Sequence, residues 1–243
     1  MLMNQEIVSK NEDLHYVLAE YVNEFNLTKF IDSPKIERYR NNILYSIGHN
    51  DKNEIEIGPL QKNKRVYNCT TNLTSCELAN EICDFIKVWI NSFSKLPVIN
   101  YNTKDGFWRH INIRNNKKND FLIVLRFNNY NKYDKIWKDE VNYLIEYLQD
   151  VAHQKRYNFI GLYYQECIGK REPRVSDPIY ENYKKNNLIE EILDIKFIID
   201  PLAFFQVNSY TAEIIFKNVV DMIEKDNCGI LLDLCCGTGV YSL

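Results

Sequence analysis

The sequence predicts an α+β domain that is followed by the first elements of an α/β domain. Two observations lead to this prediction. Between residues 35 and 199, short strand-like runs alternate with two amphipathic helices, which is typical of an α+β fold with a mixed or antiparallel sheet. Near the C-terminus an apolar run ends in Asp233 and then reaches Gly237 and Gly239, as a parallel strand does when it enters a tight turn beside a ligand.

Composition sets the outer limits on what the chain can be. It has 243 residues, of which 45% are hydrophobic and 26% charged, so it can bury a core as one large or two small domains. The sequence contains no apolar run of about 20 residues, so we expect no membrane partner, and we expect a cytoplasmic monomer. A nuclear or mitochondrial location stays open. The net charge is −3, so any nucleic-acid surface must be a local patch.

The seven cysteines indicate a reducing compartment, because their number is odd and no secretion signal precedes them. No two of them have Cys-x-x-Cys spacing, so we expect no zinc site and no other metal. The cysteines are Cys69, Cys76, Cys83, Cys167, Cys228, Cys235 and Cys236.

The predicted α+β domain spans residues 33–198 and follows an N-terminal helical extension at 1–32. Apolar residues recur at helical spacing in the extension, and its role cannot be read from the sequence. Helices are expected at 77–93 and 135–153. Strands are expected at 43–47, 54–57, 65–68, 108–114, 121–127, 159–164 and 195–199. In the strand at 108–114, alternation places Arg109 on the same face as Ile111 and Ile113, and Trp108 on the opposite face.

Residues 199–243 are expected to begin the second domain. A short apolar strand is predicted to run through Gln206 and Asn208 into a helix, and the next strand is predicted at 230–234. The Gly-x-Gly turn alone would also fit an ordinary strand and turn, because the third glycine of a dinucleotide-binding motif is missing.

Two motifs in this segment resemble the RNA 5-methyluridine methyltransferase family. They are Phe204-Phe205-Gln206-Val207-Asn208-x-x-x-Ala212-Glu213 and Asp233-x-Cys235-Cys236-Gly237-Thr238-Gly239. Together they resemble the eukaryotic tRNA (uracil-5-)-methyltransferase branch. Similar but weaker matches lie at Ser33-Pro34, Tyr39-Arg40-Asn41 and Gly106-Phe107-Trp108-Arg109-His110, so the resemblance covers about residues 33–243.

The resemblance implies that the second domain is the truncated start of a Rossmann-like, class I methyltransferase domain that uses S-adenosylmethionine. Gln206 matches a glutamine that contacts this cofactor, and Cys235 occupies a loop position that lines it. Gly237 and Gly239 permit the close turn. Asp233 is expected to order the loop. The alternative for Gln206 is a strand-end amide that caps the following helix.

The resemblance also implies a tRNA partner. Tyr39 and Arg40 match an early motif of the substrate domain, and Trp108, Arg109 and His110 match a later one; aromatic and guanidinium groups suit unstacked RNA loops. The alternative to RNA contact is a core position for Trp108 and, for the basic residues, a solvated loop. Basic patches could assist at Lys62, Lys64 and Arg65, at Arg109, Arg114, Lys117 and Lys118, and at Lys170, Arg171 and Arg174.

The implied reaction is methylation of C5 of a tRNA uridine, in the T-loop. A cysteine thiolate adds to C6, C5 then attacks the sulfonium methyl group, and a base removes the C5 proton. In the family these two catalytic groups lie near Asp-Pro-Pro-Arg and Ser-Cys-Asn-Pro stretches, and neither stretch occurs in these 243 residues. We therefore expect no catalytic residue in this fragment and no activity from it alone. The rival hypotheses are a non-catalytic RNA-binding remnant and a class I methyltransferase with another substrate.

Overall fold

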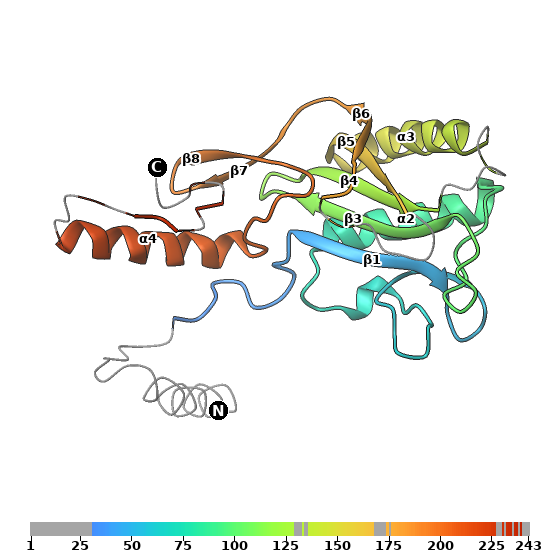
Figure 1. Ribbon diagram of the computed structural model, residues 1–243, viewed down its shortest axis with the longest axis horizontal. Coiled ribbons are helices and arrows are strands. Elements are labelled where there is room, and N and C mark those ends of the chain that lie inside the picture. Colours follow the sequence, from blue (N-terminus) through green and yellow to red (C-terminus); the bar gives the residue numbers. More distant parts are fainter. Residues whose placement is uncertain are drawn as a thin grey trace. The chain divides into compact units, whose positions relative to one another are not determined.

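The computed structural model describes residues 31–128, 133, 136–167, 174, 176–226, 230, 232–234, 236, 237 and 239. The chain divides into two compact units, residues 1–34 and 35–243. The described part of the second unit contains a six-stranded sheet, two helices against one face of this sheet, a two-stranded hairpin and a C-terminal helix (Figure 1). The predicted extension at 1–32 lies almost wholly outside the described residues.

The large sheet has the strand order β2-β1-β3-β4-β5-β6. Its strands are β1 (Asn42–His49), β2 (Ile55–Gly58), β3 (Trp108–Asn115), β4 (Asp120–Phe127), β5 (Asn158–Glu166) and β6 (Tyr180–Lys184). Neighbouring strands are antiparallel except for β4 and β5, which are parallel because helix α3 (Ile136–Lys155) connects them. The sheet is therefore mixed, which confirms this part of the predicted fold class.

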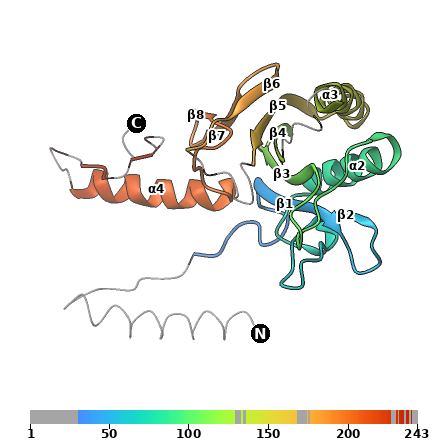
Figure 2. The same ribbon diagram turned by 45° about the vertical axis from the view of Figure 1, so that its right-hand side comes forward.

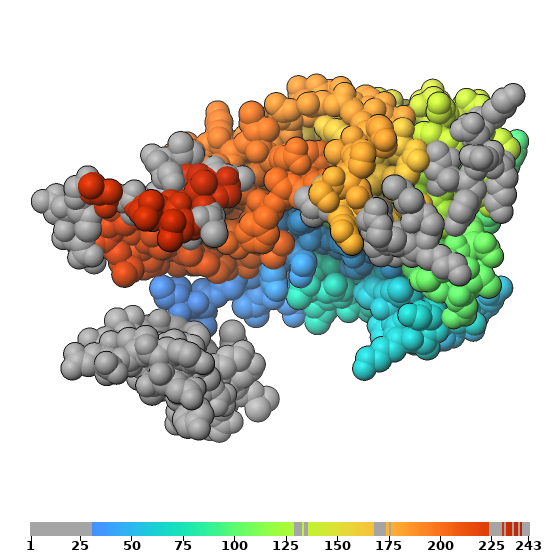
Figure 3. All heavy atoms as spheres, viewed as in Figure 1, coloured from blue at the N-terminus to red at the C-terminus, as the bar shows by residue number. Residues whose placement is uncertain are grey.

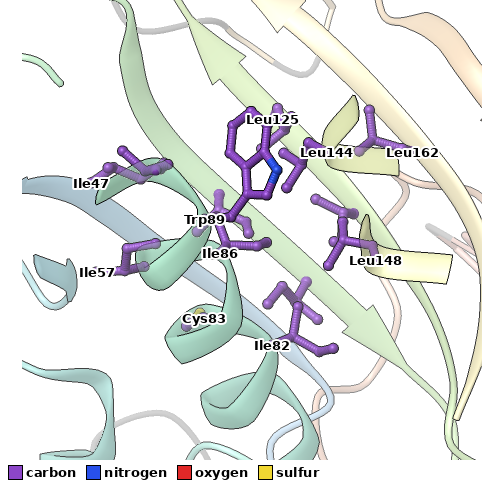
Figure 4. Packing of buried hydrophobic residues seen from close by; sticks show 14 of the residues in the cluster. Ile47, Ile57, Ile82, Cys83, Ile86, Trp89, Leu125, Leu144, Leu148 and Leu162 are labelled. Carbon is purple, nitrogen blue, oxygen red and sulfur yellow. The ribbon is translucent and has the colours of Figure 1, made fainter. Parts of the chain in front are cut away.

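Helices α2 (Glu77–Phe93) and α3 cover one face of the sheet and form the main core with it. Figure 4 shows Ile86 and Trp89 of α2 in the same cluster as Leu144 and Leu148 of α3 and Leu162 of β5. The helix predicted at 77–93 is confirmed at both ends, because its apolar side chains recur every three to four residues and bury one continuous stripe.

Strand β3 contains a bulge that corrects the predicted faces of this strand. Its pairing with β4 shifts register between Trp108 and His110, so that Arg109 lies at the irregularity. Trp108 therefore lies in the main core with Ile111 and Ile113, on the face where simple alternation had placed Arg109.

A second hydrophobic cluster joins the sheet to the hairpin β7 (Leu188–Ile192) and β8 (Ile195–Ile199) and to helix α4 (Ser209–Asp226). Leu193 and Asp194 connect the two strands, and both have positive φ values, of 50° and 65°. Such a two-residue turn matches the twist of a hairpin, but glycine or asparagine usually occupies it. Strands β6 and β7 were not predicted from the sequence.

Three predicted strands are wrong. Residues 202–208 form an irregular segment, and at 65–68 only Val66 pairs, through an isolated bridge to Leu60. The described residues among 230–234 are not in a strand either, and their apolar side chains are exposed. In each case the local sequence is compatible with a strand, but no neighbouring described strand supplies a ladder of hydrogen bonds. The domain boundary at 198/199 stays a prediction.

Candidate cofactor and RNA site

The irregular segment at 200–208, which contains Gln206, is held against the end of the sheet by Arg114. Nη1 of Arg114 donates to the carbonyl oxygens of Asp200, at 2.8 Å, and of Ala203, at 2.6 Å. Burial lowers the pKa of Arg114 to about 10, and the charge of Asp200 opposes this shift, so the guanidinium remains charged at neutral pH. Arg114 therefore anchors the chain and does not belong to a solvent-facing basic patch.

Asn41, the residue directly before strand β1, binds the same segment. Its backbone N–H donates to the carbonyl oxygen of Val207 at 3.0 Å, and its Nδ2 lies 3.3 Å from the carbonyl oxygen of Gln206. The same Nδ2 donates to Oγ of Ser209 at 2.8 Å. The third residue of the Tyr39-Arg40-Asn41 motif thus fixes the backbone that presents Gln206.

A buried carboxylate completes this network. Oγ of Ser209 donates to Oε2 of Glu190 at 2.6 Å, and the Glu190 side chain is 3% exposed. Burial raises the pKa of Glu190, while the hydrogen bond from Ser209 acts in the opposite direction. Glu190 comes from β7, whose inward face also carries Leu188 and Ile192.

The start of helix α4 is capped by Asn208. Its Oδ1 accepts hydrogen bonds from the backbone N–H groups of Tyr210 and Thr211, at 3.2 Å and 3.1 Å. The capping role considered for Gln206 therefore belongs to Asn208, and Gln206 itself is half-buried. Two residues before it, the Phe204 ring is 78% exposed.

At the predicted cofactor loop the chain turns tightly. Gly237 and Gly239 have φ values of 57° and 75°, and the N–H of Gly239 donates to the carbonyl oxygen of Cys236 at 2.8 Å. These are left-handed conformations that glycine adopts without strain. Asp233 is half-buried, and Cys235 lies outside the described residues. The cofactor roles of all these residues stay predictions.

A cavity of about 400 Å³ lies between the Tyr39 motif and the start of α4. Tyr39 and Asn41 line one side, and Ser209 and Tyr210 line another. The side-chain nitrogens of Lys35 and Lys117 lie 5.3 and 5.6 Å from the centre of the Tyr210 ring, within the range of a cation–π interaction. Arg40 is exposed, and its Nε donates to the carbonyl oxygen of Asn42 at 3.1 Å.

The later motif, by contrast, is inside the protein. Trp108 and Arg109 are each 1% exposed and His110 is 8% exposed, so none presents a free surface to RNA. Nε1 of Trp108 donates to Oγ of Ser94 at 2.9 Å, and Nη1 of Arg109 donates to Oδ1 of Asn128 at 3.1 Å. The prediction that these residues contact RNA is replaced by roles in packing and in the β3 bulge.

Sequence reasoning missed the network of Asn41, Arg114, Ser209 and Glu190. Arg114 was assigned to a basic patch because nothing in a sequence shows which carbonyl groups surround a cation. Glu190 lies in the missed strand β7, where its alternation with Leu188 and Ile192 was the available signal.

No group of three or more histidine, cysteine, aspartate or glutamate side chains that could hold a metal occurs among the described residues. Within the same part of the chain, none of the helices is long and apolar enough to span a membrane.

Comparison with known proteins gives consistent matches, although no family model matches the chain. The chain is 26% identical over 227 residues to human tRNA (uracil-5-)-methyltransferase homolog B, covering 89% of this chain and 44% of that protein. It is 24% identical over 247 residues to an RNA methyltransferase of Caldanaerobacter subterraneus, covering 99% of this chain and 52% of that protein. The chain spans about half the length of these relatives.

A solved structure shares the fold. The crystal structure of Pyrococcus abyssi tRNA (uracil-54, C5)-methyltransferase in complex with S-adenosyl-L-homocysteine matches with a TM-score of 0.72 and 21% sequence identity. The match covers 98% of this chain and 52% of that one. By sequence and by fold, the chain is therefore related over almost its whole length to tRNA (uracil-5-)-methyltransferases and other RNA methyltransferases, which confirms the resemblance predicted from its motifs.

Proposed function

We propose that the chain supplies the RNA-binding part and the start of the cofactor-binding part of an S-adenosylmethionine-dependent tRNA (uracil-5-)-methyltransferase. The observation that carries this proposal is the contact between the two motifs. Asn41 of the early motif binds the backbone of Gln206 and Val207, so residues more than 160 positions apart form one site. The similarity to a protein named tRNA (uracil-54, C5)-methyltransferase favours uridine 54 of the T-loop as the target.

The described residues suit a nucleoside cofactor. Backbone N–H groups at a glycine turn and a half-buried amide are the donors that a ribose and an amino-acid carboxylate require. Gln206, Gly237 and Gly239 would hold S-adenosylmethionine, with Asp233 ordering the loop and Cys235 beside it. The cofactor supplies the methyl group. The thiolate and the base of the proposed covalent mechanism are not assigned to any residue of this chain.

The RNA would meet exposed aromatic and cationic groups next to this segment. The Phe204 ring is the most exposed aromatic side chain among the described residues and is two positions from Gln206. An unstacked base can stack on such a ring, which is worth about 1–3 kcal/mol per base. Tyr39 and Arg40 directly precede Asn41 in the chain and would contact the same RNA segment.

Binding measurements on the 243-residue chain test this proposal. We expect the chain to bind tRNA and S-adenosylhomocysteine without transferring a methyl group. Gln206→Ala should weaken cofactor binding about tenfold and leave tRNA binding unchanged, whereas Phe204→Ala should weaken tRNA binding alone. The matched control is Phe93→Ala, which removes an exposed ring from the far end of α2.

Three outcomes would count against the proposal. If Gln206→Ala had no effect on cofactor affinity, the assignment of the cofactor site would be wrong. If tRNA bound but no cofactor did, the chain would be an RNA-binding module. Methyl transfer to a substrate other than RNA would favour a different methyltransferase.

A further inference from the structure

A second polar pocket lies at the opposite end of strand β1 from the Gln206 segment. It has a volume of about 140 Å³, and its polar lining consists of His49, Asn53, Lys64, Arg65, Asn100 and Asn102. The lining comes from the β1–β2 turn, the turn before Val66, and the loop before β3. We call it the three-turn pocket. In Figure 2 the turn between β1 and β2 lies at the end of β1 that is away from α4.

Tight turns fix the shape of this pocket. Asn53 and Lys64 have positive φ values of 62° and 64°, and each closes its turn with a backbone hydrogen bond of 3.0 Å. In the third loop, the N–H of Lys104 donates to the carbonyl oxygen of Asn100 at 2.7 Å. Short hydrogen-bonded turns of this kind hold side chains in place better than open loops do, so the pocket is largely preformed.

The pocket is rich in donors and has no carboxylate in its lining. Nη1 of Arg65 donates to the carbonyl oxygen of Asn50 at 3.2 Å, which anchors the guanidinium and leaves its other N–H groups for a ligand. Within the described part of the chain, neither Lys64 nor Arg65 forms an ion pair. Oδ1 of Asn100 accepts from the N–H groups of Asn102 and Thr103, so the NH₂ side of this amide remains for a ligand.

The nearby acidic residues are engaged elsewhere. Oδ2 of Asp51 accepts a hydrogen bond from the Tyr67 hydroxyl at 3.1 Å, and Oε2 of Glu54 accepts from Nδ2 of Asn50 at 3.0 Å. Neither carboxylate lines the pocket. A small pocket with two cations that form no ion pair among the described residues, a histidine and amide donors fits a compact anion with several acceptor oxygens.

The geometry points to a phosphate-binding site, and we infer that its ligand is a phosphate group of the RNA backbone. This inference rests on the proposed RNA substrate. β1 is 8 residues long, so the three-turn pocket lies about 23 Å along the strand from Asn42 and the Gln206 segment, at about 3.3 Å per residue. A single nucleotide cannot reach both places, whereas a folded RNA arm can. The site would therefore contact a part of the RNA away from the reacting base.

The test compares tRNA binding by two variants of the same turn. Lys64→Ala/Arg65→Ala removes both cations of the pocket, whereas Lys62→Ala removes an exposed lysine of this turn that does not line it. We expect the double variant to lose about tenfold in tRNA affinity near 0.1 M salt, with a slope of log affinity against log salt that is shallower by about 1–2. Lys62→Ala should stay within about twofold. Equal losses in the two variants would overturn the inference.

Titration with inorganic phosphate distinguishes two sources of this ligand, which are free phosphate and a phosphate group of the RNA backbone. Burial and the neighbouring Arg65 lower the pKa of His49, so a bound anion should raise it, which NMR of the His49 ring detects. We expect phosphate to raise this pKa in the wild type but not in Lys64→Ala/Arg65→Ala, and tRNA to compete with phosphate.

Two results would limit or refute the assignment to RNA. If phosphate bound without competition from tRNA, the pocket would be a small-anion site and the inference would be wrong. If tRNA did not bind at all, the RNA part of the proposed function would fail as well, and the phosphate titration alone would decide whether an anion site exists. Urea unfolding of each variant separates loss of binding from loss of folding.

Discussion

Arg114 is a buried side chain that holds the Gln206 segment in place. Its guanidinium is buried and donates to the carbonyl groups of Asp200 and Ala203. A hydrogen bond that involves a charged group contributes about 1.5–3 kcal/mol. We expect Arg114→Ala to lower the free energy of unfolding by about 2–4 kcal/mol, measured by urea denaturation.

Arg114→Lys is the control for this prediction. Lysine keeps the charge but not the planar fork, so it should recover only part of the loss. If Arg114→Ala unfolded at the same urea concentration as the wild type, these hydrogen bonds would contribute nothing to stability.

Glu190 makes stability depend on pH. Burial raises its pKa above the usual 4.5. Between pH 4.5 and this raised value, the folded chain binds more protons than the unfolded chain, so the contribution of Glu190 to stability is fully present below pH 4.5 and is lost as pH rises. Glu190→Gln keeps an acceptor for Ser209 without a buried charge. We expect it to be at least as stable as the wild type at pH 7, with a flatter dependence of the unfolding free energy on pH.

Glu191→Gln is the matched control, because Glu191 is the next residue and its pKa is lowered by the Lys118 ammonium. Glu191→Gln should leave unchanged the fall of the unfolding free energy with pH that we assign to Glu190. A Glu190→Gln variant whose stability still fell from acid to neutral pH as steeply as in the wild type would contradict the prediction.

These residues also show what a sequence can reveal about a site. Gln206, Gly237 and Gly239 were proposed because they lie in two motifs that resemble a known family, and their cofactor role stays a prediction. Asn41 binds two backbone carbonyl groups and the Ser209 hydroxyl, and Glu190 binds the same hydroxyl; these partners are far away in the chain, and no local pattern encodes them. Trp108 was identified as part of a motif, but the sequence did not decide between RNA contact and a place in the core, since a buried and an exposed tryptophan look alike in a sequence.

At the scale of elements, helix α4 depends on its first cap. Replacing an asparagine at this position with alanine typically costs about 0.5–2 kcal/mol. We expect Asn208→Ala to lower the unfolding free energy by about 1 kcal/mol and to speed hydrogen exchange in the first turn of α4. Asn208→Asp should preserve both, because its carboxylate also accepts from the N–H groups of Tyr210 and Thr211. Equal exchange rates in Asn208→Ala and the wild type would show that the cap does not hold this turn.

The elements that were predicted correctly are those with a strong period. α2 was found at both ends and β4 within a residue, because each buries a continuous apolar stripe or run. β8 was also found at both ends, because four of its five residues are apolar, although only Phe197 and Ile199 are buried. β6 was missed because its sequence, Tyr-Glu-Asn-Tyr-Lys, is that of a polar edge strand. The false strand at 202–208 is apolar because it packs on the second cluster, through Phe205, without joining a sheet.

At the scale of the whole molecule, several apolar side chains of β8, α4 and the segment after it are largely exposed. Exposed fractions reach 64% for Ile198 and Met222 and 76% for Leu232, and these residues belong to β8, α4 and the segment after it. Figure 3 shows α4 and the segment after it, in orange-red and red, at one end of the molecule. Large exposed apolar patches favour association. We therefore expect the 243-residue chain to self-associate at high concentration, although a monomer was predicted from the sequence.

Light scattering tests this expectation. Ile198→Lys/Met222→Lys should shift the chain toward the monomer with little change in unfolding free energy, because both side chains are largely exposed. Ile36→Lys/Leu44→Lys changes two exposed apolar residues outside β8, α4 and the segment after it, and it should leave the fraction of monomer unchanged. A wild-type chain that stayed monomeric at every concentration would remove the argument for association through this surface.

The nine residues between β8 and α4 are tied down at Asp200, Ala203, Gln206 and Val207, and Ser209 is tied at the helix start. A connection fastened at so many points cannot serve as a hinge, and it cannot absorb an inserted or deleted residue without breaking several bonds at once. Its length should therefore be as strictly limited as that of a secondary-structure element. Lengthening it by one glycine should uncouple α4 from the sheet far more than any substitution of an exposed side chain within it.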